Sequence, residues 1–241
     1  MRRLDGARQG AEAPAWTAPK RGQRWATFDC YGTLIDWNGG VGRELKRLFG
    51  AERAPRLLHV YHELEREIEH ERPTASYREV LTTALVRLAE REGLDLAAAE
   101  EDALARALPS WQPFPEVRAA LEGARGAGWK LVILSNTDRD FIGASMERIG
   151  VPFEFAIVAS ELGSYKPASR HWQAFAERVD VESVSHVHVA ASLYHDIAPA
   201  RELGLPTVWI NRLGEEPEPQ PDVELHSLTG LADALDSLAP A

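Results

Sequence analysis

Residues 24–36 read Arg-Trp-Ala-Thr-Phe-Asp-Cys-Tyr-Gly-Thr-Leu-Ile-Asp, and this stretch decides the fold. Its apolar run ends at Asp29, and Gly32 then marks a turn, which predicts a short buried strand with a carboxylate at its end. Strands of the same form are predicted at residues 129–134, 153–158, 187–191 and 206–210. Helical patterns lie between them, at residues 117–126, 138–149, 170–179 and 197–203. This alternation predicts right-handed βαβ units and a parallel sheet.

Residues 38–111 interrupt the alternation, because they show helical periodicity and no strand pattern. We expect them to form an all-helical cap inserted into an α/β core made of residues 24–37 and 112–241. The core is predicted to be a three-layer α/β/α, Rossmann-like domain. Gly39-Gly40 and Pro113-Phe114-Pro115 are the predicted joints between core and cap. Residues 1–23 are predicted to be a flexible N-terminal tail.

The composition describes an ordinary globular protein. Of 241 residues, 44% are hydrophobic and 27% charged, and the formal net charge is −10. The negative charge argues against nucleic acid or an anionic membrane surface as a partner. One cysteine excludes an intramolecular disulfide framework and a cysteine-built zinc site. With no apolar run long enough for a transmembrane helix or a signal peptide, we expect a cytoplasmic protein, and a homodimer is left open.

Polar side chains follow the predicted strands where each strand ends. Asp29 ends the first strand, Ser135-Asn136 ends the second, Lys166 follows the third and Asp196 follows the fourth. In open α/β sheets the ligand lies outside the carboxyl ends of the strands. We therefore expect these four groups to converge on one site.

The same residues carry a family resemblance. Residues 28–36 resemble the first motif of the haloacid dehalogenase superfamily, whose leading Asp is a nucleophile. Ser135-Asn136, Lys166-Pro167 and residues 192–196 resemble its second, third and fourth motifs. The motifs stand in the family's order, and the predicted cap lies where the first subclass of the family carries its own. The resemblance covers residues 25–235.

Two departures separate this chain from the phosphatases of that superfamily. Tyr31 replaces the second Asp, which protonates the leaving alkoxide, and a phenol with a pKa of about 10 is a poor acid at neutral pH. Ala190-Ala191 stand where the fourth motif normally supplies an acid that binds Mg²⁺. We therefore expect no cofactor. Only under a phosphatase alternative would Mg²⁺ bind, through Asp29, the Tyr31 backbone and Asp196.

Tyr31 is also what the type II, or L-, 2-haloacid dehalogenases of the superfamily show. The resemblance implies a hydrolase acting on the carbon–halide bond of a small anionic 2-haloacid. Asp29 would attack the carbon bearing the halogen and form an ester. Water would then cleave the ester to give a 2-hydroxy acid. A halide leaves without a proton, so no acid is needed beside Asp29.

The resemblance also implies roles for the other residues. Asp196 would activate or orient the water, and Lys166 would keep Asp29 ionised. Thr33, Ser135 and Asn136 would donate hydrogen bonds to carboxylate oxygens. Substrate-binding roles are expected for a further set: Tyr31, Trp172, Ser192, His59 and Tyr61. His59 and Tyr61 stand near the position of the family's halide-binding cap Arg, and Arg56 or Arg66 could substitute from one turn away.

Alternatives remain open at this point. One is a Mg²⁺-dependent phosphatase or another hydrolase of the superfamily, and a less favoured one is an inactive binding protein. His186 and His188 share one face of a strand and are expected to pack in the core. Cys30 is expected to point into the core, away from Asp29. Trp37 and Trp111 flank the cap and either wall the pocket or pack the hinge.

Overall fold

The computed structural model describes residues 22–179 and 185–239. Within them, parallel strands form one six-stranded sheet in the order β3-β2-β1-β4-β5-β6. The strands are β1 (Arg24–Phe28), β2 (Trp129–Ser135), β3 (Phe155–Val158), β4 (Ser185–Ala190), β5 (Thr207–Ile210) and β6 (Val223–Leu225). The predicted parallel sheet is confirmed. Because β1 lies between β2 and β4, the segments that follow these three strands meet at one edge.

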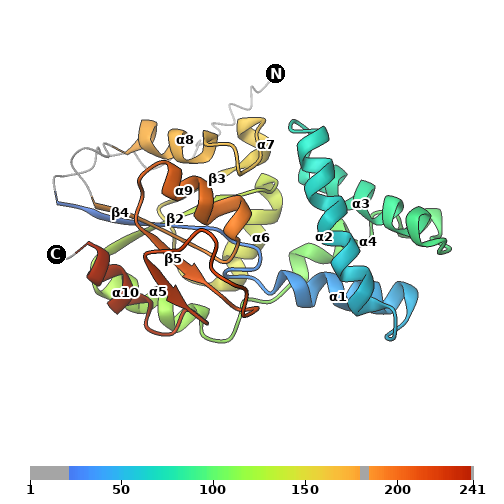
Figure 1. The fold of residues 1–241 in the computed structure, drawn as a ribbon, viewed down its shortest axis with the longest axis horizontal. Helices are drawn as coiled ribbons and strands as arrows, with labels where there is room; N and C mark the ends of the chain where they lie inside the picture. The colour runs from blue at the N-terminus through green and yellow to red at the C-terminus, as the bar shows by residue number, and fades with distance from the viewer. Residues whose placement is uncertain (1–21, 180–184, 240–241) are drawn as a thin grey trace, which may run out of the picture.

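Helices cover both faces of the sheet (Figure 1). On one face α5 (Val117–Gly126), α6 (Arg139–Ile149) and α10 (Leu231–Leu238) pack on the main hydrophobic cluster. On the other, α8 (Arg170–Arg178) and α9 (Ala198–Glu202) pack on a second cluster. Successive strand residues alternate between the faces: Trp25 belongs to the second cluster and Ala26 to the main one. The sheet therefore has a helical layer on each side, as predicted.

The structure corrects several predicted element bounds. The third strand starts at Phe155, two residues later than expected, and the fourth starts at Ser185. Two short helices that were not predicted follow strands at the site: α7 (Ala159–Leu162) and the π-helical turn η4 (Leu193–Ile197). Strand β6 and helix α10 were missed as well, because their short patterns carry little periodic signal. The predicted N-terminal tail lies almost entirely outside the described residues.

Residues 38–111, which we call the cap, lie to one side of the sheet (Figure 1). The helical elements there, beginning one residue earlier, are α1 (Trp37–Phe49), α2 (Ala54–Glu71), α3 (Tyr77–Glu92), η1 (Ala98–Glu100), α4 (Ala103–Ala107) and η2 (Leu108–Ser110). Helix α2 packs on both α1 and α3. Its buried row Leu57, Tyr61, Leu64 and Ile68 has the spacing of one helix face. None of the helices in the described part of the chain is both long and apolar enough to cross a bilayer.

The joint between core and cap differs from the predicted one. Gly39 and Gly40 lie inside the first turn of α1, because the Asp36 side chain caps that helix at the Gly39 N–H, 2.9 Å away. The two connecting segments instead run side by side: the Asp36 N–H donates to the Gln112 carbonyl at 2.9 Å, and the Phe114 N–H donates to the Leu34 carbonyl at 3.0 Å. The hinge is thus a short backbone ladder.

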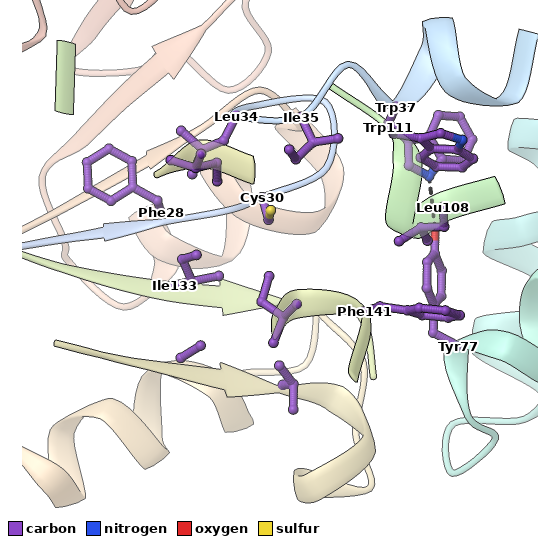
Figure 2. Packing of buried hydrophobic residues seen from close by; sticks show 14 of the residues in the cluster. Phe28, Cys30, Leu34, Ile35, Trp37, Tyr77, Leu108, Trp111, Ile133 and Phe141 are labelled. Carbon is purple, nitrogen blue, oxygen red and sulfur yellow. Dashed lines mark hydrogen bonds between the residues drawn. The ribbon is translucent and has the colours of Figure 1, made fainter. Parts of the chain in front are cut away.

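Trp37 and Trp111 pack this hinge. Both indoles are buried, and their ring centroids lie 6.4 Å apart, edge to face. A side chain at Gly40 would collide with the Trp111 ring. Figure 2 shows the hydrophobic cluster running from the sheet, at Phe28 and Ile133, to these indoles and on to Tyr77. Of the two roles left open for the tryptophans, hinge packing is the one the structure shows.

The cap is also held to the core at the start of α3. Asp138, which follows β2, accepts hydrogen bonds from the backbone N–H groups of Tyr77 (2.8 Å) and Arg78 (3.0 Å). The Tyr165 hydroxyl donates to the Ala75 carbonyl at 2.9 Å. A core carboxylate therefore satisfies the free N–H groups of a cap helix.

Candidate active site

Asp29 lies directly beyond β1, with only 7% of the residue exposed. Its Oδ1 accepts from Lys166 Nζ at 2.9 Å, and its Oδ2 accepts from Thr33 Oγ1 at 2.7 Å. Thr33 Oγ1 in turn accepts from the Ala191 backbone N–H at 2.9 Å. One charged and one neutral donor therefore fix the orientation of the carboxylate. Cys30 points into the main hydrophobic cluster, as predicted.

Lys166 connects the two carboxylates of the site. Its Nζ donates to Asp29 Oδ1, to Asp196 Oδ1 at 2.6 Å and to the Leu134 carbonyl at 2.9 Å. Three acceptors use all the protons of the ammonium. Burial opposes the charge on Lys166, but the two carboxylates outweigh it and raise the pKa of the amine. Lys166 therefore remains a cation in the interior of the protein.

The two carboxylates have opposite pKa shifts. Burial, assisted by the charge of Asp196, raises the pKa of Asp29 even though Lys166 and Thr33 act against it. Burial also acts on Asp196, but Lys166 and a hydrogen bond from His188 outweigh it and lower its pKa. Asp196 is thus firmly ionised, and Asp29 is the more basic of the pair, which suits a nucleophile.

The two residues of the second predicted motif, Ser135 and Asn136, have different surroundings. Ser135 is buried at the end of β2, and its Oγ has no hydrogen-bond partner among the described residues. Asn136 contacts the backbone of Lys166 on both sides: its Oδ1 accepts from the Lys166 N–H at 2.7 Å, and its Nδ2 donates to the Lys166 carbonyl at 3.0 Å. Asn136 therefore holds the lysine in place, whereas the Ser135 hydroxyl is free for a ligand.

Tyr31 and Ser192 are both engaged within the protein. The Tyr31 hydroxyl lies 3.0 Å from Ser145 Oγ, and its ring stacks on Tyr77 with centroids 6.1 Å apart. Burial raises the pKa of the Tyr31 phenol far above its usual value. It is therefore no proton donor to a leaving group. Ser192 Oγ accepts from the His195 backbone N–H at 3.0 Å and caps η4.

Three predicted substrate-binding residues form no hydrogen bond or ion pair with Asp29, Lys166 or Asp196 within the described part of the chain. Trp172 is buried in the second hydrophobic cluster, where its ring lies edge-on to His188 at 5.3 Å. Tyr61 is buried in the cap against Trp37, with centroids 5.8 Å apart. The His59 side chain is 80% exposed and faces Glu63. Its expected role beside the substrate is not supported, because the buried face of α2 is set by Leu57, Tyr61, Leu64 and Ile68, and His59 lies off that face.

The cap arginines considered as halide-binding groups are occupied elsewhere. Arg56 pairs with Glu92 at the surface. Arg66 donates to the His62 carbonyl at 3.3 Å, and its guanidinium lies 6.0 Å from the Tyr194 ring. Neither has a contact with Asp29 or Lys166 in the described part of the chain.

Sequence reasoning missed two residues at the site. His188 is fully buried, and its Nε2 lies 3.1 Å from Asp196 Oδ1. The rule that ligands lie at the carboxyl ends of parallel strands could have identified His188. This residue lies near the end of β4, on the face opposite Val187 and Val189. Glu69, on the cap helix α2, lies 3.4 Å from both Asn136 Nδ2 and His195 Nε2. The sequence offers one indication of Glu69: it directly follows Ile68, an apolar position on the face of α2 that is buried.

The residues of the phosphatase alternative do not fit a magnesium ion as arranged. Both oxygens of Asp29 accept from protein donors, and Asp196 Oδ1 accepts from Lys166 and His188. Residues 22–179 and 185–239 hold no group of three or more His, Cys, Asp or Glu side chains suited to a metal ion.

Known proteins are similar to this chain over most of its length. The chain is 29% identical over 221 residues to an (S)-2-haloacid dehalogenase of Pseudomonas sp. strain YL, covering 88% of this chain and 94% of that protein. It is 29% identical to haloacetate dehalogenase H-2 of Moraxella sp. strain B, covering 78% and 85%. The structure of the L-2-haloacid dehalogenase from Xanthobacter autotrophicus with chloropropionic acid covalently bound superposes with a TM-score of 0.77 at 20% identity, covering 90% and 100%.

The family itself follows from the sequence over most of its length. Residues 24–204 match the haloacid dehalogenase-like hydrolases, and that span runs from the start of β1 past the end of α9. It includes the nucleophile segment, the cap, and the segments that carry Lys166 and Asp196. With its motifs in order around one buried cluster, the chain belongs to the haloacid dehalogenase-like hydrolase family.

Proposed function

We propose that this hydrolase displaces halide from short 2-haloacids, with Asp29 as the covalent nucleophile. The observation that carries the proposal is the surroundings of Asp29: its oxygens accept from Lys166 and Thr33, and Tyr31, in place of an acid, is turned toward Ser145. A leaving group at this site has to depart without a proton. Halide does so, whereas an alkoxide does not. The relatives named as 2-haloacid dehalogenases support the same substrate class.

In the first step, an oxygen of Asp29 attacks carbon 2 of the substrate. The new carbon–oxygen bond forms as the carbon–halogen bond breaks, the halide leaves with the bonding electron pair, and the carbon is inverted. Asp29 loses its charge on becoming an ester. Lys166 and Asp196 then remain as an ion pair at 2.6 Å, so the interior keeps a balanced charge.

In the second step, water attacks the ester carbonyl of Asp29 and gives up a proton to Asp196. Lys166 and Thr33 each donate to one of the two Asp29 oxygens, and whichever binds the oxygen that is not esterified is placed to stabilise the oxyanion that develops there. As the intermediate collapses, the bond between the Asp29 carbonyl carbon and the substrate oxygen breaks, and that oxygen takes up the second proton of the attacking water. The Asp29 carboxylate is restored and a 2-hydroxy acid is released. The sum is one 2-haloacid and one water giving one 2-hydroxy acid, halide and a proton.

The Ser135 hydroxyl is proposed to bind the substrate carboxylate. It is the buried side chain at the strand end whose oxygen lacks a partner among the described residues, next to the Asn136 that holds Lys166. As further parts of the proposal we keep a cytoplasmic location, a homodimer as one oligomeric option, and the division into a core and a cap at residues 38–111.

The test is halide release from L-2-chloropropionate and monobromoacetate, with and without EDTA, for wild type and Asp29→Asn. We expect release that EDTA does not affect and that Asp29→Asn abolishes. Turnover in H₂¹⁸O followed by mass spectrometry should place ¹⁸O in the peptide that contains Asp29, because the water attacks the ester carbonyl. Turnover of a phosphate ester only, and only without EDTA, would support the phosphatase alternative. An Asp29 ester adduct would exclude an inactive binding protein.

A further inference from the structure

Asp196 is held by two donors that both bind the same oxygen. Lys166 Nζ lies 2.6 Å from Oδ1, and His188 Nε2 lies 3.1 Å from Oδ1. No side-chain hydrogen bond among the described residues reaches Oδ2. Both donors are buried: the Lys166 side chain is 1% exposed and the His188 side chain 0%. The carboxylate is therefore fixed at one oxygen and left with the other to accept a proton.

A chain of hydrogen bonds stands behind His188. Its Nδ1 lies 2.9 Å from Thr27 Oγ1, which lies 2.8 Å from His186 Nε2. The register of β1 and β4 creates this chain, because Thr27 lies directly opposite His188 and next to His186 on the same face of the sheet. The ring of Trp172 closes off its side at 5.3 Å from His188.

The direction of the bond to Asp196 follows from counting protons. Ionised Asp196 can only accept, so His188 donates through Nε2. The other bonds of the chain, from His188 Nδ1 to Thr27 Oγ1 and from there to His186 Nε2, hold the ring of His188 in place. Burial and the neighbouring His188 lower the pKa of His186 to about 3.

We infer that His188 is a positioning residue for the hydrolytic half of the reaction: it anchors Asp196 Oδ1 so that Oδ2 is presented to the water that cleaves the Asp29 ester. The inference rests on the proposed function. Its specific content is that His188 serves the second step and not the first. Asp29 accepts from Lys166 and Thr33, and neither of these has a hydrogen bond to His188 among the described residues.

Few other groups near Asp196 can titrate. Lys166 and Asp29 belong to the cluster itself, and His188 and His186 belong to the chain. His171, on α8, lies 3.2 Å from the Ser135 carbonyl through Nε2, and burial together with Lys166 lowers its pKa to about 3. With both outer histidines neutral, the acid limb of the hydrolytic step reports Asp196 and the groups bonded to it.

The experiment separates the two chemical steps by rapid quench with L-2-chloropropionate. Halide release in the first turnover reports formation of the ester, and intact-protein mass spectrometry reports the fraction of Asp29 held as ester. The variants are His188→Leu, which removes the donor, and His188→Gln, whose amide can place an N–H near the position of Nε2. His226→Leu is the control for loss of a histidine outside this chain of hydrogen bonds, since His226 Nδ1 lies 3.3 Å from the Asn211 carbonyl.

For His188→Leu we expect first-turnover halide release within about 3-fold of wild type and ester hydrolysis slower by about 10–100-fold, as for loss of a group that orients a reacting residue. The ester then accumulates, and the acid limb of the kcat profile moves to higher pH because Asp196 loses a donor. His188→Gln should regain most of the hydrolysis rate. His226→Leu should change both steps by less than about 3-fold.

Several outcomes would overturn the inference. If His188→Leu slows both steps equally, or if no ester accumulates, His188 has no specific role in hydrolysis. If His188→Leu does not fold, Thr27→Val takes its place: it frees the ring of His188, and unchanged ester levels in that variant would also overturn the inference. Failure of wild type to release halide would instead contradict the proposed function itself. The two failures are therefore distinguishable.

Discussion

The molecule contains two close pairs of carboxylates in different surroundings: Asp29 and Asp196 in the core, both buried, and Glu65 and Glu69 in the cap, of which Glu69 is buried and Glu65 half-buried. In the core, Asp29 and Asp196 share the Lys166 ammonium, which lies 2.9 and 2.6 Å from their oxygens. In the cap, Glu65 and Glu69 lie one turn apart on α2, and neither forms an ion pair with a Lys or Arg among residues 22–179 and 185–239. Burial and the charge of Glu69 raise the pKa of Glu65 to about 8. In the core pair the Lys166 ammonium offsets the charge of the carboxylates, whereas in the cap pair burial and the neighbouring carboxylate favour a proton on Glu65.

The comparison shows what a buried cation contributes. Without one, a carboxyl group that lies next to another avoids the cost of a buried charge by staying protonated. Glu65 then depends on neutral partners: the Tyr77 hydroxyl donates to its Oε1 at 2.6 Å and accepts from Trp37 Nε1 at 2.9 Å, the bond drawn in Figure 2. The cap pair is thus connected through Tyr77 to Trp37 at the hinge, whereas the core pair belongs to the proposed reaction.

The largest effect is expected from Lys166→Met, which turns the core pair into a pair like that of the cap. Removing one partner from a buried ion cluster costs about 3–5 kcal/mol of unfolding free energy. One of Asp29 and Asp196 should then hold a proton at neutral pH, and kcat for halide release should fall by about 10³-fold or more. Urea unfolding and halide release measure the two effects. Lys46→Met, at an exposed lysine, is the control, and equal losses in both variants would contradict the assignment.

A smaller effect is expected at Asp138, the core carboxylate that binds the start of a cap helix. Asp138→Ala leaves the Tyr77 and Arg78 N–H groups without their acceptor and should cost about 1–2 kcal/mol of unfolding free energy. Hydrogen exchange should also rise in the first turn of α3. Asp140→Ala is matched, because Asp140 is exposed and pairs with the Arg78 side chain at 2.7 Å. A loss no greater than that of Asp140→Ala would show that Asp138 does not hold the cap.

Sequence patterns placed the core pair better than the cap pair, for a physical reason. Parallel strands bring their carboxyl ends to one edge, so Asp29, Lys166 and Asp196 could be expected to meet before any coordinates were known. Nothing comparable fixes which side of a cap helix faces the core. His59 was expected at the site and is exposed, whereas Glu69, ten residues along the same helix, lies beside Asn136. That choice depends on how α2 packs on α1 and α3, which is tertiary information.

The histidines of β4 show the same limit of prediction from sequence. The alternation of β4 put His186 and His188 on one face, but not which neighbours that face meets. Thr27 and Asp196 come from β1 and η4, and their contacts with His188 depend on strand order and on the unpredicted π-helical turn. Trp172 stood at the spacing of a binding residue, yet the register of α8 buries it behind His188. Spacing along the chain shows how many residues separate a side chain from a motif, but not which way that side chain points.

The proton on Glu65 predicts a pH dependence of stability. Its pKa in the folded protein, about 8, lies above the ordinary value of 4.5. The folded state therefore holds a proton that the unfolded chain releases above pH 4.5, and stability falls as the pH rises from there toward 8. Glu65→Gln cannot release a proton, so its Tm should fall less than that of wild type between pH 5 and pH 8. Thermal unfolding over that range measures the difference, with exposed Glu67→Gln as control. Parallel curves for wild type and Glu65→Gln would mean that Glu65 is ionised in the fold.

The smallest effect concerns the remaining charge of the cap pair and bears on the substrate. Glu69 is buried, 3.4 Å from Asn136 Nδ2 and His195 Nε2, two residues of the second and fourth motifs. A negative charge there opposes the approach of an anionic 2-haloacid, as does the net charge of −10, and a screened charge pair near a protein surface is worth about 1 kcal/mol or somewhat more.

Glu69→Gln should therefore lower KM for L-2-chloropropionate by about 3–10-fold and leave kcat close to wild type, since one charge is removed and an acceptor for Asn136 is kept. The neutral amide of the same acid should show no change in KM as a substrate or Ki as an inhibitor. Exposed Glu67→Gln, two residues away on α2, controls for the overall charge. An unchanged KM for the acid would mean that a charge at Glu69 does not act on the substrate, although Glu69 lies 3.4 Å from two residues of the second and fourth motifs.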